Sequence, residues 1–393
     1  MPGCCGFGCR LVWWTAQRGK PRGTGMDEKR FWIGFNLVRG VGAVRLQSLI
    51  DHFGDAASAW RAEPADLRAA GLGPKLVERL LEVRSGVDLD RLWEKFTAQG
   101  IHILTWEDDA YPARLKEIEQ PPPVLYVRGE FLPEDSFAVA LVGTRRVTAY
   151  GRQITEELAS HLAANGVTVI SGLARGVDAV AHSAALKAGG RTVAVLGSGV
   201  DRIYPPEHRA LAEQMLARGG LLSDYAPGTA PDSANFPPRN RIISGMSLAV
   251  VVVEAGETSG ALITAEFAAE QGREVFAVPG SILAPQSKGT NRLIQQGALP
   301  LLTPQDVLQA LNLTRIGEQK AARRILPGDA LEAQLLNAIG LEPVHIDEIR
   351  NQTGLPVEKV SAALVMMELK GLVRQVGGMQ YVAVREVQSD YFT

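Results

Sequence analysis

The sequence has 393 residues, which is too long for one compact core, so we expect two or three domains. Apolar residues make up 46% of the chain and charged residues 21%, as in an ordinary globular protein. The formal net charge of −2 excludes a global positive field, so a nucleic-acid site would have to be a local cluster of lysine and arginine. No apolar run approaches the roughly 18 residues of a membrane span, so no membrane contact is expected.

The first 25 residues differ from the rest of the chain. They hold all three cysteines, Cys4, Cys5 and Cys9, which leaves none for a disulfide framework or a structural zinc site in the folded body and favours a reducing, cytoplasmic location. Because residues 1–25 are rich in glycine and arginine and show no helical or strand period, we predict a disordered or artefactual extension. Met26 is then the candidate true start.

Residues 26–105 have a helical pattern that repeats internally. A Gly-x-Gly turn precedes an amphipathic run twice, at residues 40–42 and 71–73, and glycine lets such a turn reach positive φ. The pattern predicts a helical domain of the helix-hairpin-helix or SAM-like type, whose turn amides and helix N-termini could hold a DNA phosphate. Few cations lie near these turns, so a helical interaction domain that touches no DNA is the alternative.

Apolar runs dense in β-branched residues alternate with helical stretches over residues 106–311. The expected strands lie at residues 137–142, 167–170, 192–196, 221–224, 248–254, 274–278 and 299–302. The helical stretches between them include residues 151–165, 177–188, 207–218 and 261–271. This alternation predicts an α/β domain with a doubly wound, extended Rossmann-like parallel sheet, whose ligand site lies at the carboxyl ends of the strands.

Residues 312–328 are polar and charged, as expected of a linker, and residues 329–386 predict a winged-helix domain. Helical patterns at 330–339, 346–353 and 357–370 precede two short strands joined by two glycines. Between positions 329 and 390, nine acidic residues outnumber five basic ones, which gives a local net charge of −4. Because duplex binding depends on phosphate neutralisation, we favour protein docking or autoinhibition over DNA binding for this domain.

Two arginines follow the first strand of the predicted sheet, in the sequence Val-Gly-Thr-Arg-Arg at residues 142–146. This loop lacks the Gly-x-Gly-x-x-Gly spacing of a dinucleotide site and the Gly-Lys-Ser/Thr of a nucleotide hydrolase. Arg145 and Arg146 instead offer permanently charged guanidinium forks suited to phosphate oxygens, with Gly143 and Thr144 beside them.

The next loop, residues 171–178, supplies hydroxyl and amide donors from Ser171 and Gly172 where a helix begins. We interpret Asp178 as a charge that satisfies the dipole of that helix. His182, one turn later, is interpreted as a packed helix residue, because no partner for a catalytic triad is in sight.

An aromatic side chain stands among cations in a predicted loop at residues 235–245, which begins Asn-Phe-Pro-Pro-Arg-Asn-Arg. Aromatic rings beside guanidinium groups suit single strands, because every base has a face for stacking, whereas duplex DNA hides it. The candidate contacts here and at the start of a later helix are Phe236, Arg239, Asn240, Arg241, Lys288 and Asn291. The alternative for Phe236 is a loop anchor packed under the two prolines.

Taken in chain order, these loops resemble the DNA-processing protein A (DprA/Smf) family. The resemblance covers roughly residues 108–303 and includes Thr-Ser-Gly-Ala-Leu-Ile-Thr-Ala at 258–265 and Val-Pro-Gly at 278–280. Mild departures are Val177, where isoleucine is usual, and Asp224, where glutamate is usual.

The resemblance implies a non-catalytic, cofactor-free mediator of natural transformation. Such a protein binds and protects incoming single-stranded DNA, helps to load a RecA-type recombinase onto it, and self-associates as a homodimer through the α/β domain. The family's DNA-pocket residues correspond here to Arg145, Phe236, Arg239 and Arg241, with Lys288 and Asn291 as further candidates.

Two rival functions stay open at this point. A nucleotide-binding, phosphoribohydrolase-like enzyme could use the same fold, and Glu266 lies near the position of its catalytic glutamate. The chain has Glu-Ala-Gly-Glu-Thr-Ser-Gly at residues 254–260 in place of that class's Pro-Gly-Gly-x-Gly-Thr pattern. A protein scaffold without any ligand is the second rival, but it does not explain so many loop cations beside a nearly neutral body.

Overall fold

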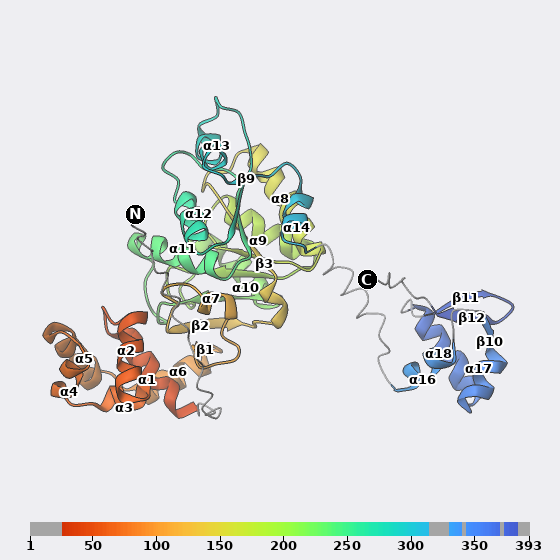
Figure 1. Cartoon of the computed structure of the whole chain (residues 1–393), viewed down its shortest axis with the longest axis horizontal. Helices are drawn as coiled ribbons and strands as arrows, with labels where there is room; N and C mark the ends of the chain where they lie inside the picture. The colour runs from red at the N-terminus through yellow and green to blue at the C-terminus, as the bar shows by residue number, and fades with distance from the viewer. Residues whose placement is uncertain (1–25, 314–329, 340–342, 370–372, 384–393) are drawn as a thin grey trace, which may run out of the picture. The chain divides into compact units, whose positions relative to one another are not determined.

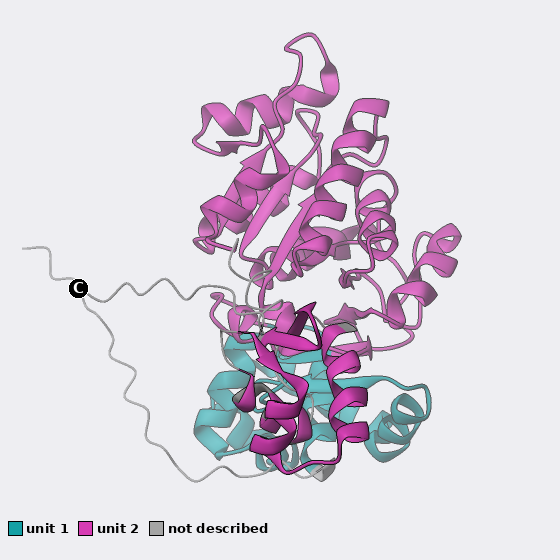
Figure 2. Cartoon of the chain, turned by 90° about the vertical axis from the view of Figure 1, so that its right-hand side faces the viewer, with its two compact units in different colours: residues 1–111, 122–125 teal, residues 112–121, 126–393 magenta. Residues whose placement is uncertain are grey.

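The computed structural model describes residues 26–313, 330–339, 343–369 and 373–383. The predicted extension, residues 1–25, and most of the predicted linker lie outside the described residues. The chain divides into two compact units, residues 1–111 with 122–125 and residues 112–121 with 126–393 (Figure 2).

The first unit is helical, as the sequence predicts. Its elements are α1 (Met26–Leu37), α2 (Ala43–Phe53), α3 (Ala56–Arg61), α4 (Pro64–Ala69), α5 (Pro74–Gly86), α6 (Leu89–Ala98) and the short strand β1 (His102–Thr105). Aromatic rings fill its core, where Phe35 and Trp60 meet edge to face with their centroids 5.1 Å apart. Gly40 and Gly71 have φ values of 102° and 95°, so both predicted turns adopt the left-handed backbone that glycine allows.

The second unit contains an α/β body with helices on both faces of a central sheet (Figure 1). Its strands are β2 (Val124–Gly129), β3 (Ala138–Val142), β4 (Thr168–Ser171), β5 (Thr192–Val195), β6 (Gly219–Ser223), β7 (Ala249–Val252), β8 (Glu274–Ala277) and β9 (Leu299–Pro300). Its α-helices are α7 (Ala113–Lys116), α8 (Ala149–Ala164), α9 (Val177–Lys187), α10 (Arg209–Leu216), α11 (Phe236–Gly245), α12 (Ala261–Glu270), α13 (Lys288–Gln295) and α14 (Pro304–Ala310). Single 3₁₀ turns lie at η1 (Pro133–Ser136), η2 (Pro206–His208), η3 (Ser233–Asn235) and η4 (Pro285–Ser287).

The strand order is β2-β6-β5-β4-β3-β7-β8-β9, and all neighbours from β6 to β9 are parallel. The chain moves outward from β3 to β6 and then returns to the other side of β3 with β7. The order therefore reverses between β3 and β7, where the loops after these two strands separate and open a crevice. The doubly wound class is confirmed.

Alternating strand residues cover the two faces of the sheet, as a side-chain period of two requires. Val139, Leu141, Val251 and Phe276 point to one face and pack against α8, α9 and α14. Intervening residues such as Val250 are equally buried and face the other side, where α12 packs on β7. Both faces are thus apolar, which is why the strands read as continuous hydrophobic runs in the sequence.

One sequence prediction for this body is wrong, and one strand was not predicted. The segment at 235–245 was expected to be a loop, but it forms α11, with two prolines in the first turn, where a missing N–H costs no hydrogen bond. The sheet is mostly parallel, as expected, but the unpredicted strand β2 pairs antiparallel with β6 from Tyr126 to Gly129.

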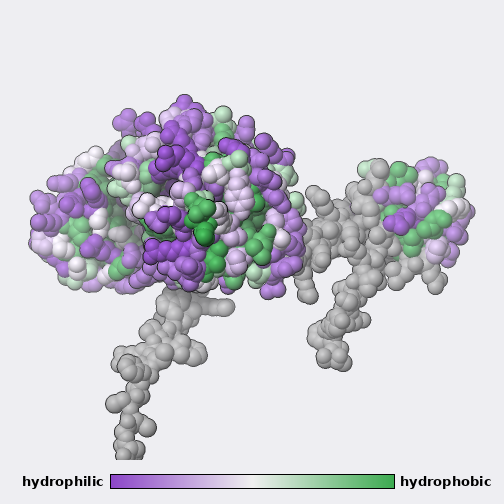
Figure 3. Space-filling view, turned by 90° about the horizontal axis from the view of Figure 1, so that it is seen from above, coloured by the Kyte–Doolittle hydropathy of each residue, from purple (hydrophilic) through white to green (hydrophobic). Residues whose placement is uncertain are grey.

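The described part of the C-terminal region forms a winged helix, as predicted. It comprises α16 (Ala330–Ala338), β10 (Val344–His345), α17 (Ile346–Thr353), α18 (Val357–Leu369), β11 (Val373–Gly377) and β12 (Gln380–Ala383). The strands pair antiparallel in the order β10-β12-β11 over a core that includes Leu335, Ile349 and Leu364. Figure 3 shows apolar side chains on its surface, and Val365 and Met366 on α18 are about half exposed.

Candidate functional site

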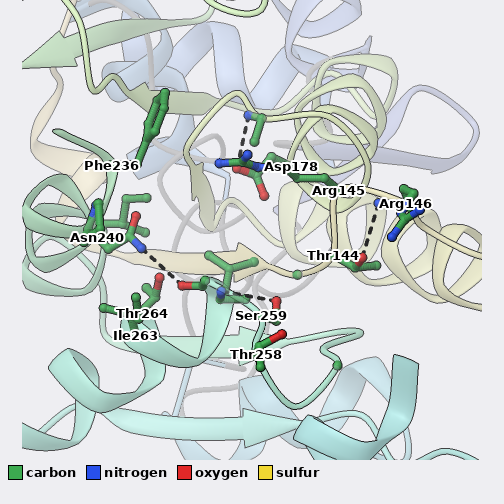
Figure 4. A pocket seen from close by; sticks show the side chains of 18 of the residues that line it. Thr144, Arg145, Arg146, Asp178, Phe236, Asn240, Thr258, Ser259, Ile263 and Thr264 are labelled. Atoms are coloured by element: carbon green, nitrogen blue, oxygen red, sulfur yellow. Dashed lines mark hydrogen bonds between the residues drawn. The ribbon is translucent and has the colours of Figure 1, made fainter. Parts of the chain in front are cut away.

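A cavity of about 980 Å³ opens at the carboxyl ends of β3 and β7, where the strand order reverses. Its lining comes from the loop after β3, the first two turns of α11, and the segment that leads from β7 into α12 (Figure 4). The lining residues that carry the argument below are Thr144, Arg145, Arg146, Asp178, Tyr204, Phe236, Arg239, Asn240, Ile243, Thr258, Ser259, Gly260 and Thr264.

One side of this cavity, here called the arginine wall, consists of Arg145, Arg146, Phe236 and Arg239. Two guanidinium groups lie near the Phe236 ring, whose centroid is 5.5 Å from Cζ of Arg145 and 5.8 Å from Cζ of Arg239. A second aromatic ring, that of Tyr204, lies with its centroid 5.9 Å from that of Phe236. Cations at these distances are attracted by the ring face, so the arrangement combines positive charge with an aromatic surface.

The helical form of α11 explains which of its side chains reach the cavity. Phe236, Arg239, Asn240 and Ile243 follow the spacing i, i+3, i+4 and i+7, which places them on one helix face, and all four line the cavity. Arg241 lies two positions after Arg239 and therefore points to another side of the helix.

Arg239 is a buried cation fixed by backbone carbonyls. Only 5% of the residue is exposed, and its Nη1 donates to the carbonyl oxygens of Gly172, at 2.9 Å, and Val195. Its Nε donates to Oδ1 of Asn240 at 3.3 Å. Burial lowers the pKa of Arg239 to about 10, partly offset by the nearby Asp178 carboxylate, so the side chain stays charged at neutral pH.

The loop after β4 supports this cation. The Asp178 carboxylate accepts hydrogen bonds from the backbone amides of Gly172 and Ala174 at 3.1 and 3.2 Å, in line with its predicted helix-terminal role. Burial raises the pKa of Asp178, while the charge of Arg239 acts in the opposite direction. Ser171 is fully buried, donates to the Leu141 carbonyl at 2.6 Å, and does not line the cavity.

The opposite side, here called the α12 wall, consists of Thr258, Ser259, Gly260 and Thr264 around the start of α12 (Figure 4). Thr264 is only 2% exposed, and its side chain lines the cavity together with Thr258 and Ser259. The hydroxyl groups of this wall can donate and accept hydrogen bonds, so they suit a polar ligand. Asn240 joins the walls, because its Nδ2 donates to the Gly260 carbonyl at 3.3 Å.

The structure brings most of the predicted site residues together. Seven of them line the cavity: Gly143, Thr144, Arg145, Arg146, Phe236, Arg239 and Asn240. Gly172 lines a small adjoining cavity of about 40 Å³ beside Arg145 and Phe236. The Phe236 ring is not merely an anchor under the prolines, because it rests on Gly197, where a Cβ would come within 2.8 Å of the ring, and contributes to the open lining.

Three predicted contacts do not line this cavity and have partners elsewhere. Arg241 donates to Oδ2 of Asp224 at 3.1 Å and also to the Gln120 carbonyl. Nζ of Lys288 lies 3.6 Å from a carboxylate oxygen of Glu257. The remaining residue, Asn291, exchanges hydrogen bonds of 3.0 and 3.2 Å with the backbone of residue 280.

The sequence interpretation missed Tyr204 and the α12 wall. The motif that carries Thr258, Ser259 and Thr264 was used to identify a family resemblance and to weigh an enzymatic alternative, although small hydroxyl residues before a helix are a recognisable signal for an anion or polar ligand. No sequence signal marked Tyr204, which reaches the cavity from a loop after β5.

Residues considered for catalysis lie away from the cavity. Glu266 is exposed on α12 and does not line it. His182 is fully buried, with its Nδ1 2.7 Å from Oγ1 of Thr192, as expected for a packed helix residue. In the residues that the structure describes, no group of three or more His, Cys, Asp or Glu side chains could hold a metal ion, and no helix has the length and apolar character needed to cross a membrane.

The fold and the cavity define a doubly wound α/β protein with a cationic, aromatic ligand pocket at its topological switch point and a separate winged helix. Residues 102–312 match the DNA recombination-mediator protein A family, and residues 319–379 match the DprA winged helix domain. The chain belongs to the DNA recombination-mediator protein A family.

Known relatives agree with this assignment. Protein Smf of Synechocystis sp. is 38% identical over 392 residues, which cover 90% of this chain and 98% of that protein. The DNA processing protein DprA of Bacillus subtilis is 44% identical over 57% of this chain and 75% of its own length. The X-ray structure of DNA processing protein A from Streptococcus pneumoniae superimposes with a TM-score of 0.62 and 35% identity, covering 71% of this chain and 97% of that one.

Proposed function

We propose that the cavity between the arginine wall and the α12 wall binds single-stranded DNA. The observation that carries this proposal is the Phe236 ring at an open cavity with the guanidinium groups of both Arg145 and Arg239 within about 6 Å of its centroid. Aromatic rings stack on bases of any sequence, and adjacent guanidinium groups neutralise the phosphates that connect them. Single strands present both features, whereas a duplex hides its base faces.

The role proposed for each residue of the arginine wall follows from how far its side chain is exposed. Arg145 and Arg146 are exposed and, among the described residues, have no carboxylate within ion-pair distance, so we assign them to phosphates. Phe236 is assigned to a base. Arg239 is buried and fixed by carbonyls, so we assign it to the floor of the cavity, where it orients the bound nucleotide and holds Asn240.

The wider role is proposed from family membership. It includes protection of the strand, loading of a RecA-type recombinase during natural transformation or recombination, homodimerisation through the α/β domain, a cytoplasmic location and no catalysed reaction. The domain limits proposed with it are 26–105, 106–311 and 329–386. Recombinase loading is tested by strand-dependent ATP hydrolysis of RecA on DNA covered by a single-strand-binding protein, which this chain should accelerate.

The stacking role of Phe236 is tested by Phe236→Ala in an anisotropy titration with oligothymidylate. Loss of one stacked base costs about 1–3 kcal/mol, so affinity should fall about 5- to 150-fold, while the salt dependence stays unchanged because no phosphate contact is lost. Phe137→Ala is the matched control, since Phe137 is 40% exposed just before β3, at the opposite edge of the sheet. Equal affinities for the two variants would refute the stacking role.

A further inference from the structure

A second cavity, of about 420 Å³, lies between α8 and α9. Residues Arg152, Glu156 and Ser160 line it from α8 at successive helical turns, and Ser183 and Lys187 line it from α9. The floor contains small residues such as Ala179 and Ala184, which leave room for an extended polymer to lie along the two helices. We call this feature the α8/α9 groove.

The α8/α9 groove carries two exposed cations whose pairing with carboxylates is weak or lacking among the described residues. Lys187 has no carboxylate within 4.0 Å among the described residues, and Arg152, which is 56% exposed, has only Glu156 at 3.9 Å on its own helix. Such exposed i,i+4 pairs contribute about 0.3–0.5 kcal/mol and are easily exchanged for a phosphate. By contrast, Arg175 and Glu207 form a close pair at 2.5 Å.

One glycine joins the groove to the main cavity. Gly176 lines the groove and has a φ of 77°, and a Cβ there would lie 2.2 Å from the carbonyl oxygen of Thr144 and 2.7 Å from the carbonyl carbon of Arg145. The groove therefore begins directly beside the loop that carries the arginine wall. His208 lies at this same end, fixed by a hydrogen bond from its Nδ1 to the Leu173 carbonyl at 2.8 Å.

We propose that a single strand bound in the main cavity continues along the α8/α9 groove, with its phosphodiester backbone on Arg152 and Lys187. This proposal rests on the proposed function. The 11 residues of α9 span about 16 Å at 1.5 Å per residue. That length corresponds to about five nucleotides at the 3.4 Å spacing along one strand of a duplex, so the groove extends the binding site beyond the cavity.

The test compares two oligothymidylates, of about 6 and about 20 nucleotides, which lie below and above the expected site size. The double variant Arg152→Gln/Lys187→Gln removes both groove cations from exposed positions. Arg292→Gln is the control, because Arg292 is an exposed cation on α13 that does not line the groove.

For the longer strand, each lost phosphate contact should reduce the slope of log affinity against log salt by about 0.7, so the double variant should lose about 1.4. The short strand should bind the wild type, the double variant and Arg292→Gln alike. An unchanged slope for the long strand, or equal losses for both strands, would overturn the groove proposal. Failure of the wild type to bind either strand would instead refute the proposed function and the groove with it.

Discussion

Gly172 lies directly against the guanidinium group of Arg239. A Cβ at position 172 would come within 2.7 Å of Nη2 and 2.8 Å of Nη1 of that side chain. The same residue accepts a hydrogen bond from Nη1 through its carbonyl oxygen. Arg239 can therefore lie buried at the floor of the cavity because position 172 has no side chain.

Gly172→Ala should displace Arg239 from its carbonyl partners. Overpacking of this kind costs about 1–3 kcal/mol of the free energy of unfolding, and single-strand affinity should fall with it. Denaturant unfolding and strand titration measure the two effects. Gly86→Ala is the control, because nothing lies within 4 Å of a Cβ at the end of α5, and that change should leave both quantities intact or raise stability. A Gly172→Ala protein with wild-type affinity would contradict the role given to Arg239.

Thr264→Val should separate stability from binding. The side chain is only 2% exposed and lines the cavity, so replacing its hydroxyl by a methyl group should leave the free energy of unfolding constant or raise it. If the hydroxyl bonds the bound strand, affinity should fall by about 0.5–1.5 kcal/mol, or roughly 2- to 13-fold. Thr155→Val is the matched control, and it should have the opposite outcome. Because Oγ1 of Thr155 donates to the Gly151 carbonyl at 2.6 Å, its loss should lower the free energy of unfolding and leave strand affinity unchanged. Wild-type affinity in Thr264→Val would exclude this contact.

His182 should make the fold sensitive to acid. Burial lowers its pKa to about 3, far below that of an exposed histidine, so between about pH 6.5 and 3 the unfolded chain binds a proton that the folded chain does not. The free energy of unfolding should therefore fall as the pH drops through this window. His182→Gln should show a shallower fall from pH 7 to pH 4 in denaturant titrations. The raised pKa of Asp178 has the opposite effect on the free energy of unfolding, but it is present in both proteins and therefore cancels in the comparison. Parallel curves of unfolding free energy against pH for the two proteins would contradict the assignment of the acid sensitivity to His182.

Much of the fold could be predicted because the parallel strands are buried on both faces and read as continuous apolar runs. The strand β2 was missed because it directly follows Pro121, Pro122 and Pro123, which favour a stiff, extended connection, and because an antiparallel strand breaks the alternation of strand and helix. The helix α11 was read as a loop because Pro237 and Pro238 suggested one, although proline fits a first helical turn.

The error at α11 also explains the misplaced Arg241. In a loop, Arg239 and Arg241 could both face the DNA, but in a helix two positions differ by about 200°, so they point to different sides. Arg241 instead connects Asp224 with the Gln120 carbonyl. The arginines at the carboxyl ends of strands could be predicted, because parallel topology alone brings those ends together. The partners of a cation such as Lys288, which pairs with Glu257, depend on tertiary packing that no local pattern reveals.

Removal of the winged helix should not weaken strand binding. This domain has its own core, and its sequence carries a local net charge of −4, which disfavours contact with phosphates. A chain that ends at Leu313 should therefore bind oligothymidylate at least as tightly as the wild type, with the same salt dependence, in an anisotropy titration. Loss of most of the affinity would show that the winged helix contacts DNA and would contradict the docking or autoinhibitory role proposed for it.

The central claim is that the arginine wall binds single strands through both phosphates and bases. Its most direct test is the affinity of the wild type and of Arg145→Ala for one oligonucleotide of about 20 nucleotides and for its duplex, measured across a range of salt concentrations. We predict far tighter binding of the single strand by the wild type, and for Arg145→Ala a weaker affinity with a salt slope reduced by about 0.7. Equal wild-type affinity for single strand and duplex, or an Arg145→Ala protein with unchanged affinity and slope, would contradict the claim.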